Sequence, residues 1–176
     1  RTPSRYALAP DLSITRVLTG LWQVADLERS GQLLPRDEAA KWLLPYAAAG
    51  FTTFDMADHY GSAEDIVGQY RAQTVGPAIE SLTKWVPEPG PITREQVRAA
   101  VDRARTRMNV ASIDLLQFHA WAYTHPSWLD AMFYLDALRR EGLIRHLGVT
   151  NTDTAHLRLI VESGVPVVSN QLCYSL

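Results

Sequence analysis

Short apolar stretches alternate along this chain with longer amphipathic stretches. The apolar stretches predict buried strands, and the stretches with a period near 3.6 residues predict helices. The predicted strands cover residues 14–22, 52–57, 79–85, 113–118, 145–149 and 167–172, and the predicted helices cover residues 36–49, 63–71, 94–108, 128–141 and 153–162. No tight two-residue hairpin is expected between the strands. Strict alternation of strand and helix predicts an α/β fold with parallel strands and right-handed crossovers.

Residues that start and stop helices support these boundaries. Thr93 and Gln96 have the spacing of a capping box before the third helix. Ser127 is expected to cap the fourth helix. Three glycines follow the ends of predicted helices, where a left-handed residue commonly ends a helix: Gly50, Gly142 and Gly164.

Two architectures fit this order, an open doubly wound sheet and a (β/α)₈ TIM barrel. A dinucleotide-binding open sheet usually carries G-x-G-x-x-G after its first strand, whereas residues 19–23 read TGLWQ and the motif is absent from the sequence. The barrel is therefore favoured. A complete barrel has eight strands and about 250 residues, so residues 1–176 are expected to form a single, partial barrel domain of about six β/α units.

Composition narrows the class of protein. The 176 residues include 17 Lys and Arg against 19 Asp and Glu, a net charge of −2, and 47% are hydrophobic. These values are typical of a globular domain and do not favour nucleic-acid or membrane partners. The one cysteine, Cys173, cannot form an internal disulfide, which favours a reducing compartment and a cytoplasmic location. The sequence leaves the oligomeric state open.

Reactive side chains gather where the predicted strands end. In a barrel these ends converge on one mouth, where the chemistry takes place. Three aromatic residues at the same level would wall such a pocket: Trp22, Trp85 and Trp121. The polar residues at this level are Asp55, Tyr60, Lys84, His119, Asn151 and Gln171.

This set suggests a proton donor. A Lys84 cation paired with Asp55 can stabilise a phenolate, so the pKa of Tyr60 is expected to fall towards neutral pH. His119 can donate a hydrogen bond to a substrate oxygen. Because no side chain donates hydride, carbonyl reduction at this site implies a nicotinamide cofactor.

Other interpretations of the same residues remain open. Asp55 and Lys84 can form a structural ion pair, Asn151 can cap a helix, and the indoles can simply fill the barrel. A metal-dependent hydrolase would use Asp55, Asp58, His59 and His119, but the sequence lacks an H-x-H at the first strand end. No metal site is therefore predicted.

Five ordered motifs carry a family resemblance. They are GFTTFDMADHYGSAE at residues 50–64, LTKW at 82–85, IDLLQFH at 113–119, GVTN at 148–151 and NQLCYSL at 170–176. In this order they resemble the aldo-keto reductase superfamily, in particular the subgroup of bacterial reductases and potassium-channel β subunits. The resemblance runs from about residue 14 to the end of the sequence.

The resemblance implies a (β/α)₈ barrel that reduces an aldehyde or ketone with NADPH. By the family pattern, Tyr60 is the general acid, Lys84 its partner, Asp55 the anchor for Lys84, and His119 the residue that orients the substrate. Thr150, Asn151 and Gln171 match positions that hold the nicotinamide carboxamide. Trp22 matches a position that lines both the cofactor and the substrate pocket, and Trp121 adds an aromatic wall.

The resemblance also implies what lies beyond this sequence. Relatives carry two further β/α units, which include the residues that bind the cofactor phosphates, so the sequence does not decide between NADPH and NADH. A different class of function is a non-catalytic regulatory subunit that senses a bound nicotinamide, as in the channel-associated relatives.

Overall fold

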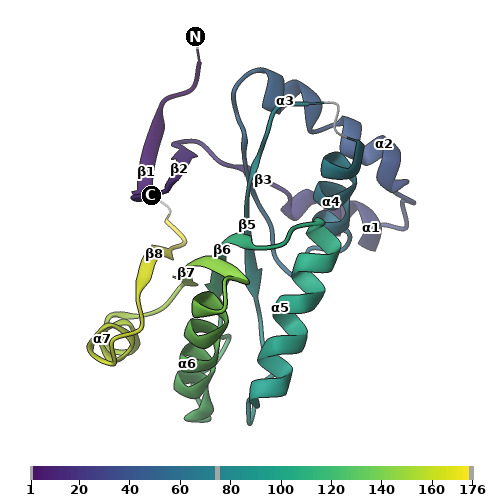
Figure 1. Ribbon diagram of the computed structural model, residues 1–176. Coiled ribbons are helices and arrows are strands. Elements are labelled where there is room, and N and C mark those ends of the chain that lie inside the picture. Colours follow the sequence, from purple (N-terminus) through teal and green to yellow (C-terminus); the bar gives the residue numbers. More distant parts are fainter. Residues whose placement is uncertain (1, 74–75, 175–176) are drawn as a thin grey trace.

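A computed structural model describes residues 2–73 and 76–174 of the chain. Its centre is a sheet of six parallel strands that lie side by side in the order in which they occur along the chain (Figure 1). The strands are β3 (Thr19–Gly20), β4 (Thr53–Asp55), β5 (Glu80–Trp85), β6 (Ile113–Phe118), β7 (Ile144–Thr150) and β8 (Val167–Gln171). The sheet forms a half-barrel, which confirms the predicted α/β class with about six β/α units.

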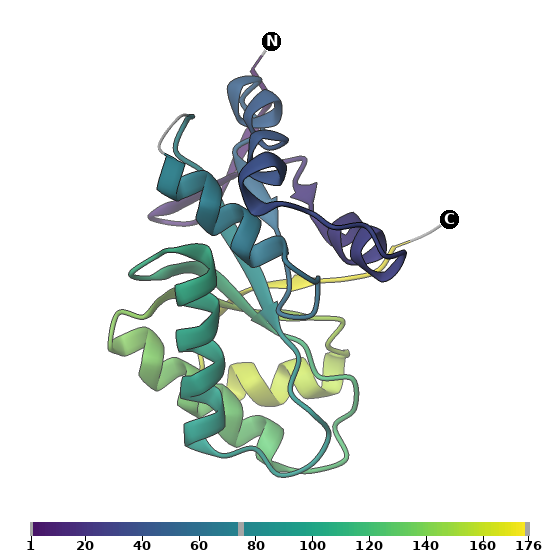
Figure 2. The same cartoon turned by 90° about the vertical axis from the view of Figure 1, so that its right-hand side faces the viewer.

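The helices cover the outer face of this sheet. Each of α4 to α7 connects two neighbouring strands, and Figure 2 shows α2, α4 and α5 in front of the strands. The helices are α1 (Trp22–Arg29), α2 (Arg36–Lys41), α3 (Leu44–Ala48), α4 (Ala63–Gln73), α5 (Arg94–Met108), α6 (Ser127–Arg140) and α7 (Thr154–Glu162).

The two faces of the sheet bury different side chains because successive residues of a strand point in opposite directions. Phe118 and Leu116 of β6 belong to the main core between the sheet and the helices. Leu115 of the same strand belongs to a second apolar cluster, which includes Leu82 of β5 and Leu12 of the N-terminal hairpin. The inner face of the half-barrel is therefore closed at its amino-terminal end by the hairpin.

The hairpin is a feature that the sequence analysis missed. Strands β1 (Arg5–Ala9) and β2 (Leu12–Thr15) pair antiparallel and are joined by Pro10 and Asp11 alone. The expectation that no tight two-residue hairpin exists is therefore wrong. Pro and Asp are residues that favour turns, and this pair was the available signal.

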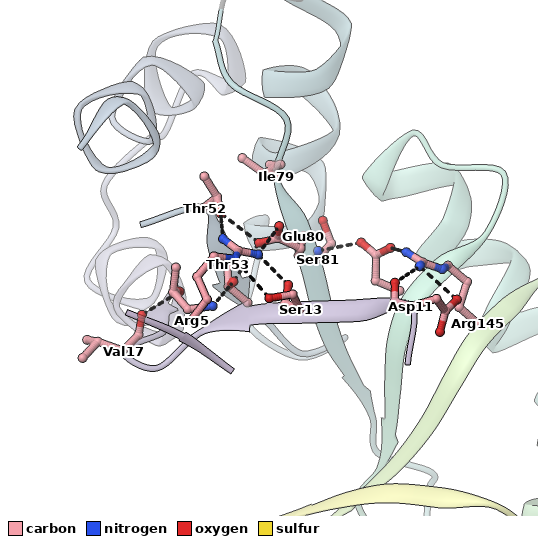
Figure 3. Close-up of polar contacts among 12 residues, drawn as sticks. Arg5, Asp11, Ser13, Val17, Thr52, Thr53, Ile79, Glu80, Ser81 and Arg145 are labelled. Carbon is pink, nitrogen blue, oxygen red and sulfur yellow. Dashed lines mark hydrogen bonds and ion pairs between the residues drawn. The ribbon is translucent and has the colours of Figure 1, made fainter. Parts of the chain in front are cut away.

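Ion pairs fix the hairpin to the amino ends of the parallel strands (Figure 3). A guanidinium nitrogen of Arg5 lies 2.6 Å from Glu80 Oε1, and a second donates to Thr52 Oγ1 at 2.8 Å. At the turn, Arg145 bridges Asp11 and Asp114, with nitrogen–oxygen distances of 3.1 and 2.7 Å. The hairpin thus has polar anchors on both sides of its apolar contact with the sheet.

Two predicted elements are divided in the structure. The strand expected at 14–22 ends in β2, resumes as the two residues of β3, and gives way to α1 at Trp22. The helix expected at 36–49 is split into α2 and α3 around residues 42–43. Pro45 lies at the start of α3 and lacks the N–H that a continuous helix would donate to residue 41.

The residues predicted to begin and end helices are confirmed except at Ser127. Thr93 and Gln96 form the predicted capping box at α5. Pro126 occupies the position before α6, and the Ser127 hydroxyl accepts a hydrogen bond from the Ile92 N–H at 2.9 Å instead of capping the helix. The three predicted helix-ending glycines have positive φ: Gly50, Gly142 and Gly164.

The open edges of the parallel sheet lead to a prediction about self-association of a polypeptide limited to residues 1–176. Within the described chain β3 and β8 each pair with only one parallel strand, and residues 167–171 carry no charge. Open, uncharged edges associate, so sedimentation should show mass increasing with concentration. Leu172→Lys, which places a charge beside β8, should reduce this association, whereas Leu33→Lys at an exposed site should not. A monomer at every concentration would contradict the prediction.

Candidate active site

Alternation along the strands gathers polar side chains on the inner face of the sheet, at its carboxyl end. Asp55 is the last residue of β4, and Lys84 lies one position before the end of β5. Gln117 lies at the same level of β6, because Lys84 and Gln117 are register partners. Gln171 ends β8. Four strands therefore supply side chains to one place.

Asp55 and Lys84 form a buried ion pair. Lys84 Nζ lies 2.6 Å from Asp55 Oδ2, and the two residues are 3% and 8% exposed. The ammonium also donates to the Met56 carbonyl oxygen at 3.0 Å. The Gln117 amide donates to Asp55 Oδ1 and the Gln171 amide to Oδ2, both at 3.3 Å. The carboxylate thus has three side-chain donors, which offset the free-energy cost of its burial.

Two of these contacts were not predicted. No role was predicted for Gln117 from the sequence, although Gln117 lies two residues before His119 and the two side chains therefore lie on the same face of β6. Gln171 is expected to hold a nicotinamide carboxamide, and its side-chain nitrogen also donates to Asp55, a contact that the sequence did not predict.

Tyr60 lies directly beside this ion pair. It follows β4 in the loop that leads to α4, and Lys84 Nζ is 5.2 Å from the centre of its ring, over the ring face. The edges of two aromatic neighbours meet it, with ring centres 5.3 Å away for Trp22 and 4.9 Å for His59. The structure therefore brings Asp55, Tyr60 and Lys84 together as the sequence predicted.

The pKa of Tyr60 shifts in the direction opposite to the expectation. Burial raises the pKa of Tyr60 above its ordinary value, and the charges of Asp55 and Cys173 raise it further. The predicted net lowering is wrong, because burial of the phenol and the charge of the Asp55 carboxylate outweigh the attraction of the paired Lys84 ammonium for a phenolate. The Tyr60 phenol consequently keeps its proton at neutral pH.

His119 follows β6 and extends the set of polar groups. Its backbone N–H donates to the Trp85 carbonyl oxygen at 2.9 Å, which continues the strand pairing by one residue. Burial lowers the pKa of His119, and the nearby His59 and Lys84 lower it further. The imidazole is therefore neutral at pH 7. Its Nδ1 atom is buried without a hydrogen-bond partner in the described chain.

The three tryptophans have different environments. Trp121 is 68% exposed, and its ring centre lies 4.9 Å from that of His119. Trp85 is buried and packs its ring against Phe118. Together with His59, both indoles line a groove of about 610 Å³ next to the loop of residues 86–92. Trp22, expected at a strand end, is the first residue of α1.

The residues assigned to the cofactor lie at the ends of β7 and β8. The Thr150 hydroxyl is buried and has no hydrogen-bond partner among the described residues, so it can serve a bound polar group. Asn151 has a left-handed backbone with φ of 50°, and its side-chain oxygen accepts from the Cys173 N–H at 2.9 Å. The free Thr150 hydroxyl fits a carboxamide of a nicotinamide. Ser175 and Leu176, which end the last motif, lie outside the described residues.

Two other features bear on the class of protein. Within residues 2–73 and 76–174, no group of three or more His, Cys, Asp or Glu side chains is placed to hold a metal ion. This includes the Asp55, Asp58, His59 and His119 set of the hydrolase interpretation. None of the helices in the described chain has the length and apolar character needed to cross a membrane.

Comparisons with known proteins agree with this geometry. A family model described as the aldo/keto reductase family matches residues 16–176. An aldo-keto reductase of Mycobacterium sp. (strain KMS) is 29% identical over 171 residues, which cover 94% of this chain and 56% of the relative. The methylglyoxal reductase DkgA of Salmonella typhimurium is 30% identical over 128 residues, which cover 70% of this chain and 44% of the relative.

Solved structures share the fold. An aldo/keto reductase from Brucella melitensis superimposes with a TM-score of 0.78 at 24% identity, covering 98% of this chain and 63% of the other. A Bombyx mori aldo-keto reductase in complex with NADP gives a TM-score of 0.76 at 22% identity, covering 99% of this chain and 59% of the other. The chain spans about half the length of the curated relatives it matches.

The buried ion pair makes a prediction about stability. In the protein as encoded, Lys84→Met leaves the Asp55 carboxylate buried without its cation, and the free energy of unfolding should fall by about 3 kcal/mol or more. Removing the charge as well, in Asp55→Asn with Lys84→Met, should recover part of this loss. Urea unfolding measures both.

The control is an ion pair at the surface. Arg98→Met breaks the ion pair between Arg98 and Glu141, whose side chains are 43% and 40% exposed, and should lower the free energy of unfolding far less than Lys84→Met. Equal losses for Lys84→Met and Arg98→Met would show that the Asp55–Lys84 pair does not stabilise the fold in the way described.

Proposed function

Because the chain belongs to the aldo/keto reductase family, we propose that it forms the catalytic part of an oxidoreductase that reduces an aldehyde or ketone to an alcohol, with Tyr60 as the proton donor. The observation that carries this proposal is the Asp55–Lys84 ion pair beneath the Tyr60 ring. The His119 imidazole, whose pKa the nearby Lys84 charge helps to lower, would join the phenol and the ammonium at the mouth of the half-barrel.

Tyr60 donates its proton to the carbonyl oxygen in this proposal. The role needs a phenol that is protonated at neutral pH, and burial keeps Tyr60 in that form. When the proton leaves, negative charge develops on the phenol oxygen. The Lys84 ammonium, which is held by Asp55 with Nζ 5.2 Å from the centre of the Tyr60 ring, would offset part of the cost of that charge.

His119 orients the substrate in the same scheme. Its neutral imidazole can donate a hydrogen bond to the carbonyl oxygen without competing with Tyr60 for proton transfer. Trp121, whose ring centre lies 4.9 Å from that of His119, would provide apolar contact for the rest of the substrate.

The proposed cofactor is a nicotinamide dinucleotide, NADPH or NADH. A bound nicotinamide would supply the hydride that the carbonyl carbon receives. In this chain Trp22, Thr150, Asn151 and Gln171 are the residues that would hold it. The Thr150 hydroxyl, buried without a partner in the described chain, supports the assignment. NADPH is favoured because a solved relative is in complex with NADP.

Substitution of Tyr60 tests the proposal. In the protein as encoded, Tyr60→Phe removes the proton donor and keeps the ring that packs against Trp22 and His59. Turnover of a generic aromatic aldehyde should fall by at least about 10²-fold, while NADPH affinity stays unchanged. NADPH oxidation measures turnover, and fluorescence titration measures cofactor binding.

The control is Tyr46→Phe, which removes an exposed hydroxyl on α3 and should leave turnover unchanged. Near-normal turnover by Tyr60→Phe would assign the proton to another residue, with His119 the next candidate. A wild-type protein that binds NADPH and reduces no carbonyl compound would instead support a regulatory subunit that senses the cofactor.

A further inference from the structure

Helix α1 contacts the Tyr60 loop at two points. Its first residue, Trp22, meets the Tyr60 ring edge to face at 5.3 Å. Near its other end, the Glu28 carboxylate accepts a hydrogen bond from the Ser62 N–H at 2.9 Å, and a second from the Ser62 hydroxyl. Both Glu28 oxygens are therefore bonded to the residue that precedes α4.

Gly61 makes the close approach of this carboxylate possible. Its backbone has φ of 55°, which few side chains tolerate. A Cβ atom at this position would lie 2.0 Å from Glu28 Oε2 and 3.4 Å from the Ala25 Cα atom. Glu28 thus occupies the space where residue 61 would carry a side chain, directly next to Tyr60.

Electrostatics favour a carboxylate at this position. Ser62 lies at the amino end of α4, where the free N–H groups and the helix dipole attract negative charge. Arg36 adds a cation 3.5 Å from Glu28 Oε1. The Glu28 side chain is 26% exposed, so it is partly shielded from water.

The other end of the loop has anchors of its own. The Val86 N–H donates to the Asp58 carboxylate at 3.2 Å, and an Arg107 guanidinium nitrogen donates to the Asp58 carbonyl oxygen at 3.3 Å. The polar contacts of the Glu28 carboxylate hold the side of the loop that follows Tyr60. Loss of Glu28 should consequently loosen this side while the strands and the Asp58 anchor stay in place.

We propose that Glu28 is a positioning residue for Tyr60, which fixes the phenol over the Lys84 ammonium by holding Gly61 and Ser62 against α1. The proposal rests on the proposed function of Tyr60 as proton donor. A displacement of a reacting group by about 1 Å can cost about 10²-fold in rate, so a contact one residue away from Tyr60 can control turnover without touching the substrate.

The test compares two carboxylates of the same helix in the protein as encoded. Glu28→Ala should lower kcat for carbonyl reduction by about 10-fold or more, with the dissociation constant of NADPH unchanged. Asp26→Ala removes an exposed carboxylate that pairs with Arg29 on the surface, and should leave kcat unchanged. Glu28→Gln, which keeps an acceptor for the Ser62 N–H, should recover part of the lost activity.

A second readout does not depend on activity. The NMR signal of the Tyr60 ring, labelled with carbon-13 at Cζ, should shift in Glu28→Ala and in the milder Ser62→Ala, but not in Asp26→Ala. Unchanged kcat and an unmoved Tyr60 signal in Glu28→Ala would overturn the proposal. If Glu28→Ala fails to fold, Ser62→Ala decides in the same way.

If the wild-type protein reduces no carbonyl compound, the proposed function fails, and the Tyr60 signal alone decides whether Glu28 positions the phenol.

Discussion

The ion pair between Lys84 and Asp55 is the constraint on which the rest of the site depends. Two charges buried at 3% and 8% exposure are stable only if their remaining donors and acceptors are satisfied. The carboxylate takes its donors from β5, β6 and β8, and itself ends β4. The strands must therefore stay in a register that brings these side chains to one level, and the hairpin anchored at the opposite end of the sheet helps to hold that register.

A satisfied ion pair also explains the state of Tyr60. The Lys84 charge is balanced by Asp55, so burial of the phenol is the largest influence on its pKa and raises it. The ammonium nevertheless remains over the ring, where it can stabilise charge that develops during proton transfer. Tyr60 thus holds its proton in the resting site, and in the proposed reaction Lys84 would offset part of the cost of forming the phenolate. In the proposed scheme, the contacts of Glu28 and Asp58 with the loop fix the phenol in place.

The sequence predicted those parts of the structure that depend on local patterns. Helix α5 matches its predicted bounds because Thr93 and Gln96 define its start. The positions of Asp55, Lys84 and His119 could be predicted because each lies at or next to the end of a predicted strand. The N-terminal hairpin, α1 and the break at Pro45 were missed, since each depends on contacts between distant segments or on one backbone N–H. The contacts of Gln117 with Asp55 and of Glu28 with Ser62 could not be predicted, because each joins segments that are distant in the sequence. The available signal for Gln117 was that it shares a strand face with His119.

The central claim is that the paired and buried site keeps Tyr60 protonated, and the pKa of Tyr60 tests it most directly. The measurement is a pH titration of carbon-13 at Tyr Cζ by NMR in the protein as encoded, with the Tyr60 signal assigned by its loss in Tyr60→Phe. The account predicts a midpoint above the ordinary tyrosine value of about 10. A midpoint below that value would contradict it, because Lys84 would then act on Tyr60 as an unbalanced cation.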